Sequence, residues 1–183
     1  MPLKPAASRL YLRPVSADDE DTLHALFCMP DVYRYLADGA PPPLTATRAW
    51  MAASAKDFAA HGYGLWLLLD AGELIGCVRL STPAAEDWVD GNTAELTYVL
   101  RPDQWGTGLA TRMSESVIAH VFDAGRITRI IAGADGPNHA SVAVMKRLSM
   151  TFARTATYPL GQGVEYLLRA QDASFQREPI PFA

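Results

Sequence analysis

The segment from Glu95 to Met113 constrains the fold of this chain more than any other. It begins as a strand whose side chains alternate between two faces, and Pro102 ends that strand because its ring supplies no N–H. Gly106 and Gly108 follow, and apolar residues then recur at helical spacing. The sequence therefore predicts a strand, a glycine-bearing turn and a helix in succession. The alternating positions are Leu96, Tyr98 and Leu100 on one face and Glu95, Thr97 and Val99 on the other, and the helical positions are Leu109, Met113, Val117 and Val121.

The turn between this strand and this helix is a predicted site for an anion. The first backbone N–H groups of a helix have no partner inside it, and the helix dipole favours negative charge there. Glycine lets a phosphate approach the backbone because it has no Cβ. The turn is not a P-loop, and Thr111 stands where a dinucleotide fingerprint has its third glycine. An ordinary strand-to-helix turn without a ligand is the alternative interpretation.

Composition and charge exclude several classes of protein. The chain has 183 residues, 49% hydrophobic and 20% charged, which is typical of a globular domain with a full core. We therefore predict a single domain over residues 1–183. The net charge of −4 and the absence of a Lys/Arg cluster argue against nucleic acid and anionic membranes as partners. No apolar run approaches the length of a membrane span and nothing resembles a signal peptide, so we expect a cytoplasmic protein.

Neither a disulfide framework nor a metal site is expected. Cys28 and Cys77 are the two cysteines, and they form no CxxC motif. The four histidines lie too far apart in the sequence for a local zinc motif. We therefore predict no metal.

Alternation and helical spacing along the rest of the chain predict an α+β fold. The expected order is a strand, two or three helices, three strands, a helix, a strand, a helix and two strands, which fits one mixed sheet flanked by helices. Thr45 is expected to cap the longest helix, and the tail from Ser174 to lie loosely on the surface. The expected strands are 9–14, 65–70, 73–81, 95–101, 129–133, 152–158 and 164–169, and the expected helices are one that starts at Ser16 or Asp18 and stops before Pro30, then 31–36, 45–61, one from Leu109, and 140–148.

Several short motifs resemble the GNAT N-acetyltransferases along the whole chain. The segment from Trp105 to Thr111 resembles the pyrophosphate loop of that family. Tryptophan at its first position is common in the branch that acetylates N-terminal amines of ribosomal proteins, to which the chain looks closest. The resemblance implies a GNAT-type fold with a mostly antiparallel mixed sheet, and acetyl-CoA as co-substrate. A non-catalytic CoA-binding regulatory module with the same fold is the alternative. The other matching motifs are Arg9-Leu-Tyr-Leu-Arg-Pro14, Ile75-Gly76, Glu95-Leu-Thr-Tyr98, Asn138-His-Ala-Ser141 and Leu148-Ser-Met150.

The resemblance implies where acetyl-CoA binds. In the family the fourth and fifth strands separate at their C-terminal ends, and the pantetheine arm pairs with the fourth strand, here through Val99 and Leu100. The N–H groups of the glycine turn would hold the pyrophosphate, with Arg101 as the nearest cation. Plain core packing of Val99 and Leu100, a solvated Arg101 and a purely capping Asn138 are the alternatives. The residues expected to bind the cofactor are Val99, Leu100, Arg101, Trp105, Gly106, Thr107, Gly108, Leu109, Ala110, Thr111, Asn138 and Ser141.

Three residues are candidates for proton transfer. Glu95 is the expected base, because acetyl transfer needs a neutral amine; an exposed or ion-paired glutamate is the alternative. Ser141 lies on the inward face of its predicted helix, and by the resemblance it faces the thioester sulfur and protonates the leaving thiolate. A hydroxyl at this place can instead only bond the backbone. Many family members use a tyrosine four residues later, where this chain has Met145, and Tyr158 on the last hairpin is the second candidate acid.

The acceptor amine is expected to enter between the N-terminal helices and the last hairpin. Direct transfer without an acyl-enzyme is predicted, because neither cysteine lies near the site motifs. A protein N-terminus, a small amine and an amino-sugar antibiotic all stay open as acceptors, and the chain can be a monomer or a homodimer. Ser149 stands where the family usually has glycine; in a left-handed conformation a serine would cost on the order of 1 kcal/mol.

Overall fold

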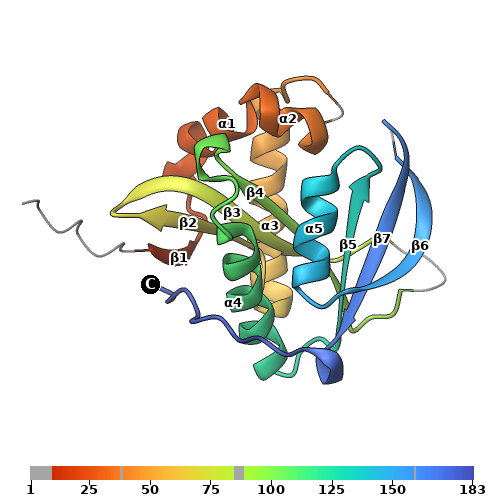
Figure 1. Ribbon diagram of the computed structural model, residues 1–183. Helices are drawn as coiled ribbons and strands as arrows, with labels where there is room; N and C mark the ends of the chain where they lie inside the picture. The colour runs from red at the N-terminus through yellow and green to blue at the C-terminus, as the bar shows by residue number, and fades with distance from the viewer. Residues whose placement is uncertain (1–9, 38, 85–88, 159) are drawn as a thin grey trace, which may run out of the picture.

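The computed structural model describes residues 10–37, 39–84, 89–158 and 160–183. At its centre is a seven-stranded sheet with helices on both faces (Figure 1). The helices and strands follow one another in the predicted order, and the α+β class is confirmed. The strands are β1 (Leu10–Pro14), β2 (Leu65–Asp70), β3 (Glu73–Ser81), β4 (Thr93–Leu100), β5 (Arg129–Asp135), β6 (Thr151–Tyr158) and β7 (Gly161–Arg169). The helices are α1 (Glu20–Phe27), α2 (Pro30–Leu36), α3 (Leu44–His61), α4 (Leu109–Asp123) and α5 (His139–Arg147), with 3₁₀ turns η1 (Ala17–Asp19), η2 (Pro102–Gln104) and η3 (Ala170–Asp172).

The sheet is mixed, with the strand order β1-β2-β3-β4-β5-β7-β6. Neighbouring strands are antiparallel except for β4 and β5, which are parallel. Helix α4 connects these two strands, as it must, because parallel neighbours need a crossover connection. The segment from Glu95 to Met113, which most constrains the fold, therefore contributes to the one parallel strand pair among the described strands of the sheet.

The alternation of side chains along the strands divides the core into two clusters, one on each face of the sheet. On β4, Leu96 packs with residues of α4 and α5, whereas Val99 packs with the N-terminal helices. Met113 of α4 is fully buried against the first of these faces. Burying such a side chain contributes about 1.5–3 kcal/mol, so a slip of one residue along β4 would be costly. The two clusters thus hold Glu95 and Tyr98 on opposite faces.

Some predicted boundaries and roles differ from the structure. Helix α3 begins at Leu44 with the extended Pro43 at the cap position, so the prediction that Thr45 caps it is wrong. Strand β5 continues two residues beyond its predicted end, to Asp135. Arg9 and Pro159, which bound two predicted segments, lie outside the described residues.

The C-terminal tail is docked on the molecule, and the prediction of a loose tail is wrong. Ile180 is fully buried, and its N–H donates to the Ser116 hydroxyl on α4 at 2.8 Å. The backbone of Leu12 on β1 donates to the carbonyl of Pro181 and accepts from the N–H of Ala183, both at 2.8 Å. The prolines in the tail predicted a surface coil, because proline has no N–H to donate. The other residues of the tail keep their N–H groups, and these groups can still pair when the segment is extended.

Helix α5 ends in a Schellman turn that has serine in its left-handed position. Ser149 has φ 61°. Its N–H donates to the carbonyl of Lys146, and the N–H of Met150 donates to that of Met145, both at 3.1 Å. The two methionines are buried, so their packing offsets the strain of roughly 1–2 kcal/mol that a left-handed serine carries. The turn therefore keeps the geometry that a glycine would give it.

Candidate active site

Strands β4 and β5 pair only at their first residues and separate beyond them (Figure 1). Thr93–Glu95 lies opposite Arg129–Ile131, whereas β4 continues to Leu100 and β5 to Asp135. Among the described residues, the C-terminal half of β4 therefore has β3 as its only strand neighbour. Backbone groups on the other side of β4 face the space between the separated strands.

Hydrogen bonds to β3 show which backbone groups of β4 face that space. The N–H of Arg101 donates to the carbonyl of Ile75 at 2.9 Å. In an antiparallel pair, residues that exchange hydrogen bonds with the partner strand alternate with residues that do not. Val99 therefore belongs to the set that faces β3, whereas the backbone groups of Tyr98 and Leu100 face away from it. This geometry favours Tyr98 and Leu100, rather than Val99, as backbone partners of a ligand.

The predicted glycine turn lies directly before α4. Gly106 and Gly108 have φ of 74° and 82°, in the left-handed region that favours glycine. Apart from the flanking residues, no atom of the described residues lies within 4 Å of the place where a Cβ on either would stand. The Thr107 hydroxyl donates to the carbonyl of Gln104 at 2.6 Å and so holds the turn. The turn thus exposes the start of α4 to open space, as an anion site requires.

The side chains beside the turn have different partners. Trp105 is half exposed, and its indole N–H donates to the carbonyl of Leu100 at 3.0 Å, which ties the turn to the end of β4. Arg101 pairs with the carboxylates of Glu73 and Asp103. These two carboxylates compensate its charge, so the geometry does not favour Arg101 as a phosphate ligand.

The first turn of α4 consists of Leu109, Ala110 and Thr111. Thr111 is buried, and its hydroxyl has no partner among the described residues. In this arrangement the Thr111 hydroxyl is shielded from solvent. Contact with an anion at this turn would therefore fall to backbone N–H groups.

Ser141 lies in the first turn of α5, beside Tyr98 on β4. The side-chain oxygen of Asn138 accepts from the N–H of Ser141 at 3.1 Å, which confirms Asn138 as the helix cap. The Ser141 hydroxyl lies 2.7 Å from that of Tyr98, which also lies 2.9 Å from the Ser141 carbonyl. Burial raises the pKa of Tyr98 to about 12, although its hydrogen bond to Ser141 opposes the shift. Sequence reasoning missed Tyr98, yet a buried tyrosine hydroxyl usually has a partner, and that rule could have found the pair.

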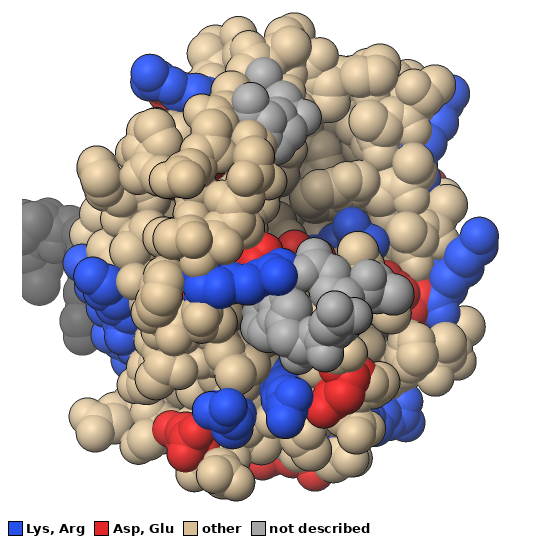
Figure 2. All heavy atoms as spheres, turned by 90° about the vertical axis from the view of Figure 1, so that its right-hand side faces the viewer, with Lys and Arg blue, Asp and Glu red and all other residues tan. Residues whose placement is uncertain are grey.

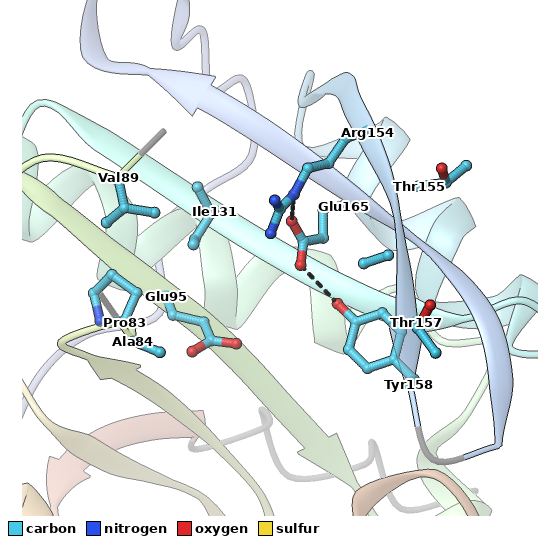
Figure 3. Close-up of a pocket in the computed structure, with 11 residues that line it drawn as sticks. Pro83, Ala84, Val89, Glu95, Ile131, Arg154, Thr155, Thr157, Tyr158 and Glu165 are labelled. Atoms are coloured by element: carbon cyan, nitrogen blue, oxygen red, sulfur yellow. Dashed lines mark hydrogen bonds and ion pairs between the residues drawn. The ribbon is translucent and has the colours of Figure 1, made fainter. Parts of the chain in front are cut away.

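A cavity of about 420 Å³ lies beside β4, β5 and the last hairpin, on the face opposite α4 and α5 (Figure 3). Glu95 projects into it from β4, and Ile131 of β5 forms part of its wall. On the hairpin side, Glu165 accepts from the Tyr158 hydroxyl at 3.3 Å and from Nε of Arg154 at 2.6 Å. Figure 2 shows acidic and basic side chains around a hollow on this side of the molecule. The cavity therefore combines charged groups with an apolar wall.

Tyr158 lies across two glycines on neighbouring strands. A Cβ on Gly133 would stand 1.8 Å from the Tyr158 hydroxyl, and one on Gly163 would stand 2.5 Å from its ring. Burial and the carboxylate of Glu165 raise the pKa of Tyr158 far above its usual range. Tyr158 is therefore neutral and donates its proton to Glu165. Local sequence pattern could not predict the contacts of Tyr158 with the two glycines and Glu165, because they join three strands.

The predicted catalytic residues lie on two faces of the sheet. Glu95 and Tyr158 line the same cavity, and Ser141 is not part of its lining. Ser141 instead lies with α5 on the other face, bonded to Tyr98. A ligand that passes between the separated strands would be in reach of both faces.

The described part of the chain holds no group of three or more His, Cys, Asp or Glu side chains placed to bind a metal. None of its helices is both long enough and apolar enough to cross a bilayer. The carboxylates near the cavity come from different strands.

Comparison with known proteins identifies the family. Residues 9–151 match the family described as the acetyltransferase (GNAT) domain. The uncharacterized protein YkkB of Bacillus subtilis (strain 168) is 25% identical over 155 residues, which cover 83% of this chain and 87% of YkkB. This match extends over most of both chains.

Solved structures share the fold at lower identity. The aminoglycoside acetyltransferase AAC(6')-Ib in complex with coenzyme A has a TM-score of 0.74 and 18% identity, covering 89% of this chain and 96% of that one. RimL, a ribosomal-protein α-N-acetyltransferase in complex with coenzyme A, has a TM-score of 0.74 and 20% identity, with 90% and 96% covered. At these identities the likeness shows the fold alone.

Fold and family match together define an acetyl-CoA-dependent acetyltransferase. The chain belongs to the GNAT acetyltransferase family, as the motifs predicted. An enzyme is therefore indicated instead of the non-catalytic module that the sequence left open. The predicted ribosomal-protein branch is not singled out, because AAC(6')-Ib and RimL resemble the chain equally well.

We expect Gly108→Ala to weaken acetyl-CoA binding by about tenfold or more, because the loss of one hydrogen bond to a charged group lowers affinity by about that factor. The added methyl group would stand where a phosphate meets the N–H groups. Gly125→Ala is the matched control, because Gly125 also has a positive φ and open space at its Cβ. Both changes therefore carry similar backbone strain. Calorimetric titration measures the affinity for acetyl-CoA, and thermal unfolding measures the stability of each variant. Equal affinity loss in both variants, or none in either, would remove the turn from the site.

Proposed function

We propose that this acetyltransferase transfers the acetyl group of acetyl-CoA directly to a primary amine that enters through the cavity. The observation that carries the proposal is the separation of β4 and β5. It connects the face that holds the glycine turn and Ser141 with the face into which Glu95 projects. The thioester would lie between the strands, with CoA on one side and the amine on the other.

The glycine turn and β4 would hold acetyl-CoA. Backbone N–H groups from Gly106 to Ala110 would bind the pyrophosphate, since the turn is open to solvent and begins a helix. The backbone N–H of Trp105 donates to the carbonyl of Pro102 instead. The pantetheine arm would pair with the backbone of Tyr98 and Leu100, which faces away from β3. The cap uses the side-chain oxygen of Asn138, so Asn138 would contact the arm through its side-chain NH2 group.

Glu95 would act as the base. It is the last residue of β4 that pairs with β5, so its carboxylate lies where the strands begin to separate. An α-amine has a pKa of about 7.7–8.0 and a lysine amine one of about 10.4, so both are mostly protonated at neutral pH. Glu95 would remove a proton from the ammonium directly or through a water. The neutral nitrogen then attacks the thioester carbonyl carbon.

Ser141, assisted by Tyr98, would act as the acid. When the tetrahedral intermediate collapses, the C–S bond breaks and the sulfur takes a proton from the Ser141 hydroxyl. The Tyr98 hydroxyl has one proton and two neighbours, the Ser141 hydroxyl oxygen and the Ser141 carbonyl. If Tyr98 donates to the hydroxyl oxygen, the proton of Ser141 is left for the sulfur. Tyr98 hydrogen-bonds the Ser141 oxygen as it gives up its proton, and the second proton that the nitrogen must lose to form the amide restores the Ser141 hydroxyl.

Tyr158 suits the acid role less well than Ser141. Its proton is engaged with Glu165, and nearby carboxylates oppose its loss because the phenolate would carry like charge. Its position in the cavity suits contact with the acceptor instead. The cysteines do not suit an acyl-enzyme either. Cys77 is buried with its pKa raised by burial to about 12, and Cys28 is not in the cavity lining.

Proteins of the same fold that act on two classes of amine support the proposal. AAC(6')-Ib has been solved with ribostamycin and coenzyme A, and RimL is named for α-N-acetylation of a ribosomal protein. Both offer an amine to the same fold. Turnover of acetyl-CoA with a panel of small amines, amino sugars and N-terminal peptides tests the proposal, and no turnover with any of them would contradict it.

Replacing the proposed base should give a pH-dependent defect. We expect Glu95→Gln to lower kcat more than tenfold near neutral pH, since positioned bases contribute about 10²–10⁴-fold. The defect should shrink as pH rises, because the amine then loses its proton to solvent. Turnover against pH, with acetyl-CoA affinity measured separately, checks this. Glu178→Gln, at an exposed glutamate outside the cavity, is the control. Parallel pH profiles for Glu95→Gln and the wild type would make Glu95 a structural residue.

A double-mutant cycle tests the proposed acid. We expect Ser141→Ala and Tyr98→Phe each to lower kcat, and the double variant to be no slower than Ser141→Ala, because Tyr98 acts through Ser141. Tyr166→Phe removes a hydroxyl from another buried tyrosine on the same face of the sheet and serves as control. Additive losses, or an unchanged kcat in Ser141→Ala, would place the acid elsewhere.

A further inference from the structure

We propose that two copies of this chain pair along strand β6, antiparallel to each other and about a twofold axis at Ala156. This interface is independent of the proposed acetyl transfer. The open edge of β6, the direction of its backbone groups and the side chains along it carry the inference.

The two edges of the sheet differ. At one edge, β1 is covered by the C-terminal tail, since Leu12 exchanges backbone hydrogen bonds with Pro181 and Ala183, both at 2.8 Å. At the other edge lies β6 (Figure 1), and none of the described strands pairs with its outer side. The N–H and C=O groups along an uncovered edge are a template for pairing with another strand.

Hydrogen bonds between β5 and β7 show which backbone groups of β7 face β6. The N–H of Gly136, which follows β5, donates to the carbonyl of Gln162 at 3.0 Å. Residues of an antiparallel strand direct their backbone groups alternately to one neighbour and to the other. Gln162 and Val164 therefore direct theirs toward β5. Gly163, which lies between them, directs its own toward β6.

The same alternation identifies the outward backbone groups of β6. Ala156 lies opposite Gly163, so its N–H and C=O groups point to β7. Thr155 and Thr157 lie opposite the two β7 residues that face β5. Their N–H and C=O groups therefore point outward from the edge of the sheet, and both threonines are exposed.

The outer side of β6 has few of the features that keep edge strands apart. Such strands are commonly short, charged or interrupted by proline or a bulge. Strand β6 has eight residues, no proline and one charged residue, Arg154, whose Nε donates to Glu165 at 2.6 Å on the cavity side. The shift of register between Phe152 and Arg154 is a bulge at Ala153, near the start of the strand, and the pairing from Arg154 onward is regular.

The outward groups of β6 match those of a second copy. With Ala156 of one copy opposite Ala156 of the other, each Thr155 meets the Thr157 of the other copy. The outward groups then pair in both directions and form about four hydrogen bonds. Arg154 lies opposite Tyr158 of the other copy, so the two guanidinium groups are not opposite each other. A twofold contact uses the same surface on both copies, so it closes at a dimer.

The neighbouring registers are less favourable. A twofold axis at Thr155 would place Thr157 opposite the bulge residue Ala153 of the other copy. An axis at Thr157 would place Thr155 opposite Pro159, which has no N–H to donate. The axis at Ala156 is therefore the register that uses both threonines fully.

The pairing would also extend the cavity. Strand β6 contributes five consecutive residues, Arg154 to Tyr158, to the cavity lining. In the pair, the cavity-side residues Arg154, Ala156 and Tyr158 stand beside the same residues of the second copy. The second copy therefore continues the wall of each cavity beyond β6, and the two cavities lie on either side of the axis.

Sedimentation velocity over a range of protein concentrations tests the pairing, and we expect the wild type to be a dimer. Thr155→Pro removes an outward N–H and leaves the hydrogen bonds between β6 and β7 in place. It should raise the dissociation constant of the dimer by about tenfold or more, because each dimer loses two hydrogen bonds. Thr155→Val keeps the N–H and the shape of the side chain, and this control should remain a dimer.

Cross-linking tests the register and does not depend on Thr155→Pro being folded. The Cα atoms of the two Ala156 residues would lie about 4.5 Å apart, which is within the range of a disulfide. In a Cys28→Ser background, which leaves only the buried Cys77, we expect Ala156→Cys to form a disulfide-linked dimer under mild oxidation. Ala153→Cys is the control on the same strand, since its two copies would lie about 20 Å apart and should not cross-link.

The outcomes separate this interface from other uses of the edge. A wild type that is monomeric at every concentration would overturn the inference, and so would a dimer that persists unchanged in folded Thr155→Pro. Cross-linking of Ala153→Cys as fast as Ala156→Cys would overturn the register. A monomer whose kcat/KM for N-terminal peptides falls in Thr155→Pro, but not in Thr155→Val, would assign the edge to a peptide acceptor instead.

Discussion

The arrangement of this site depends on a parallel pair of strands that stops pairing after three residues. Backbone N–H and C=O groups without partners are costly when they are buried, so a strand that loses its neighbour needs water or a ligand in its place. Here α4 and α5 cover one face of the strands and the cavity opens on the other. An extended arm that pairs with Tyr98 and Leu100 would restore the missing hydrogen bonds. The same separation that weakens the sheet therefore provides the place where acetyl-CoA and amine would meet.

The two faces carry groups with different chemistry. On the side of α5, two neutral hydroxyls, those of Ser141 and Tyr98, are held 2.7 Å apart. Among the described residues that line the cavity, the carboxylates of Glu95 and Glu165 accompany one guanidinium, that of Arg154. This division matches direct transfer, because a thiolate must gain a proton on one side while an ammonium must lose one on the other. It is produced by alternation along β4, which directs Glu95 and Tyr98 to opposite faces.

Sequence reasoning predicted what depends on local pattern and missed what depends on contacts across strands. The order of elements, the glycine turn and the Asn138 cap follow from periodicity and backbone chemistry. The pairing of Tyr98 with Ser141 joins residues 43 positions apart, and Glu165 engages its partners from the neighbouring strand. The docked tail was missed for the same reason, since its partners lie on β1 and α4. Val99 shows a finer limit: the pattern identified the strand, but only the register shows which backbone groups face β3 and which face away from it.

Backbone amide exchange measured by NMR tests the central claim most directly, namely that the arm of acetyl-CoA pairs with β4 where β5 has separated. The amide of Leu100 should exchange more slowly when acetyl-CoA is bound. Adenosine 3′,5′-bisphosphate, which lacks the pantetheine arm, should leave its exchange rate unchanged, and the amide of Val99, which faces β3, reports any general stabilisation. A Leu100 amide that acetyl-CoA protects no more than it protects Val99 would contradict this account, because the arm would then lie elsewhere.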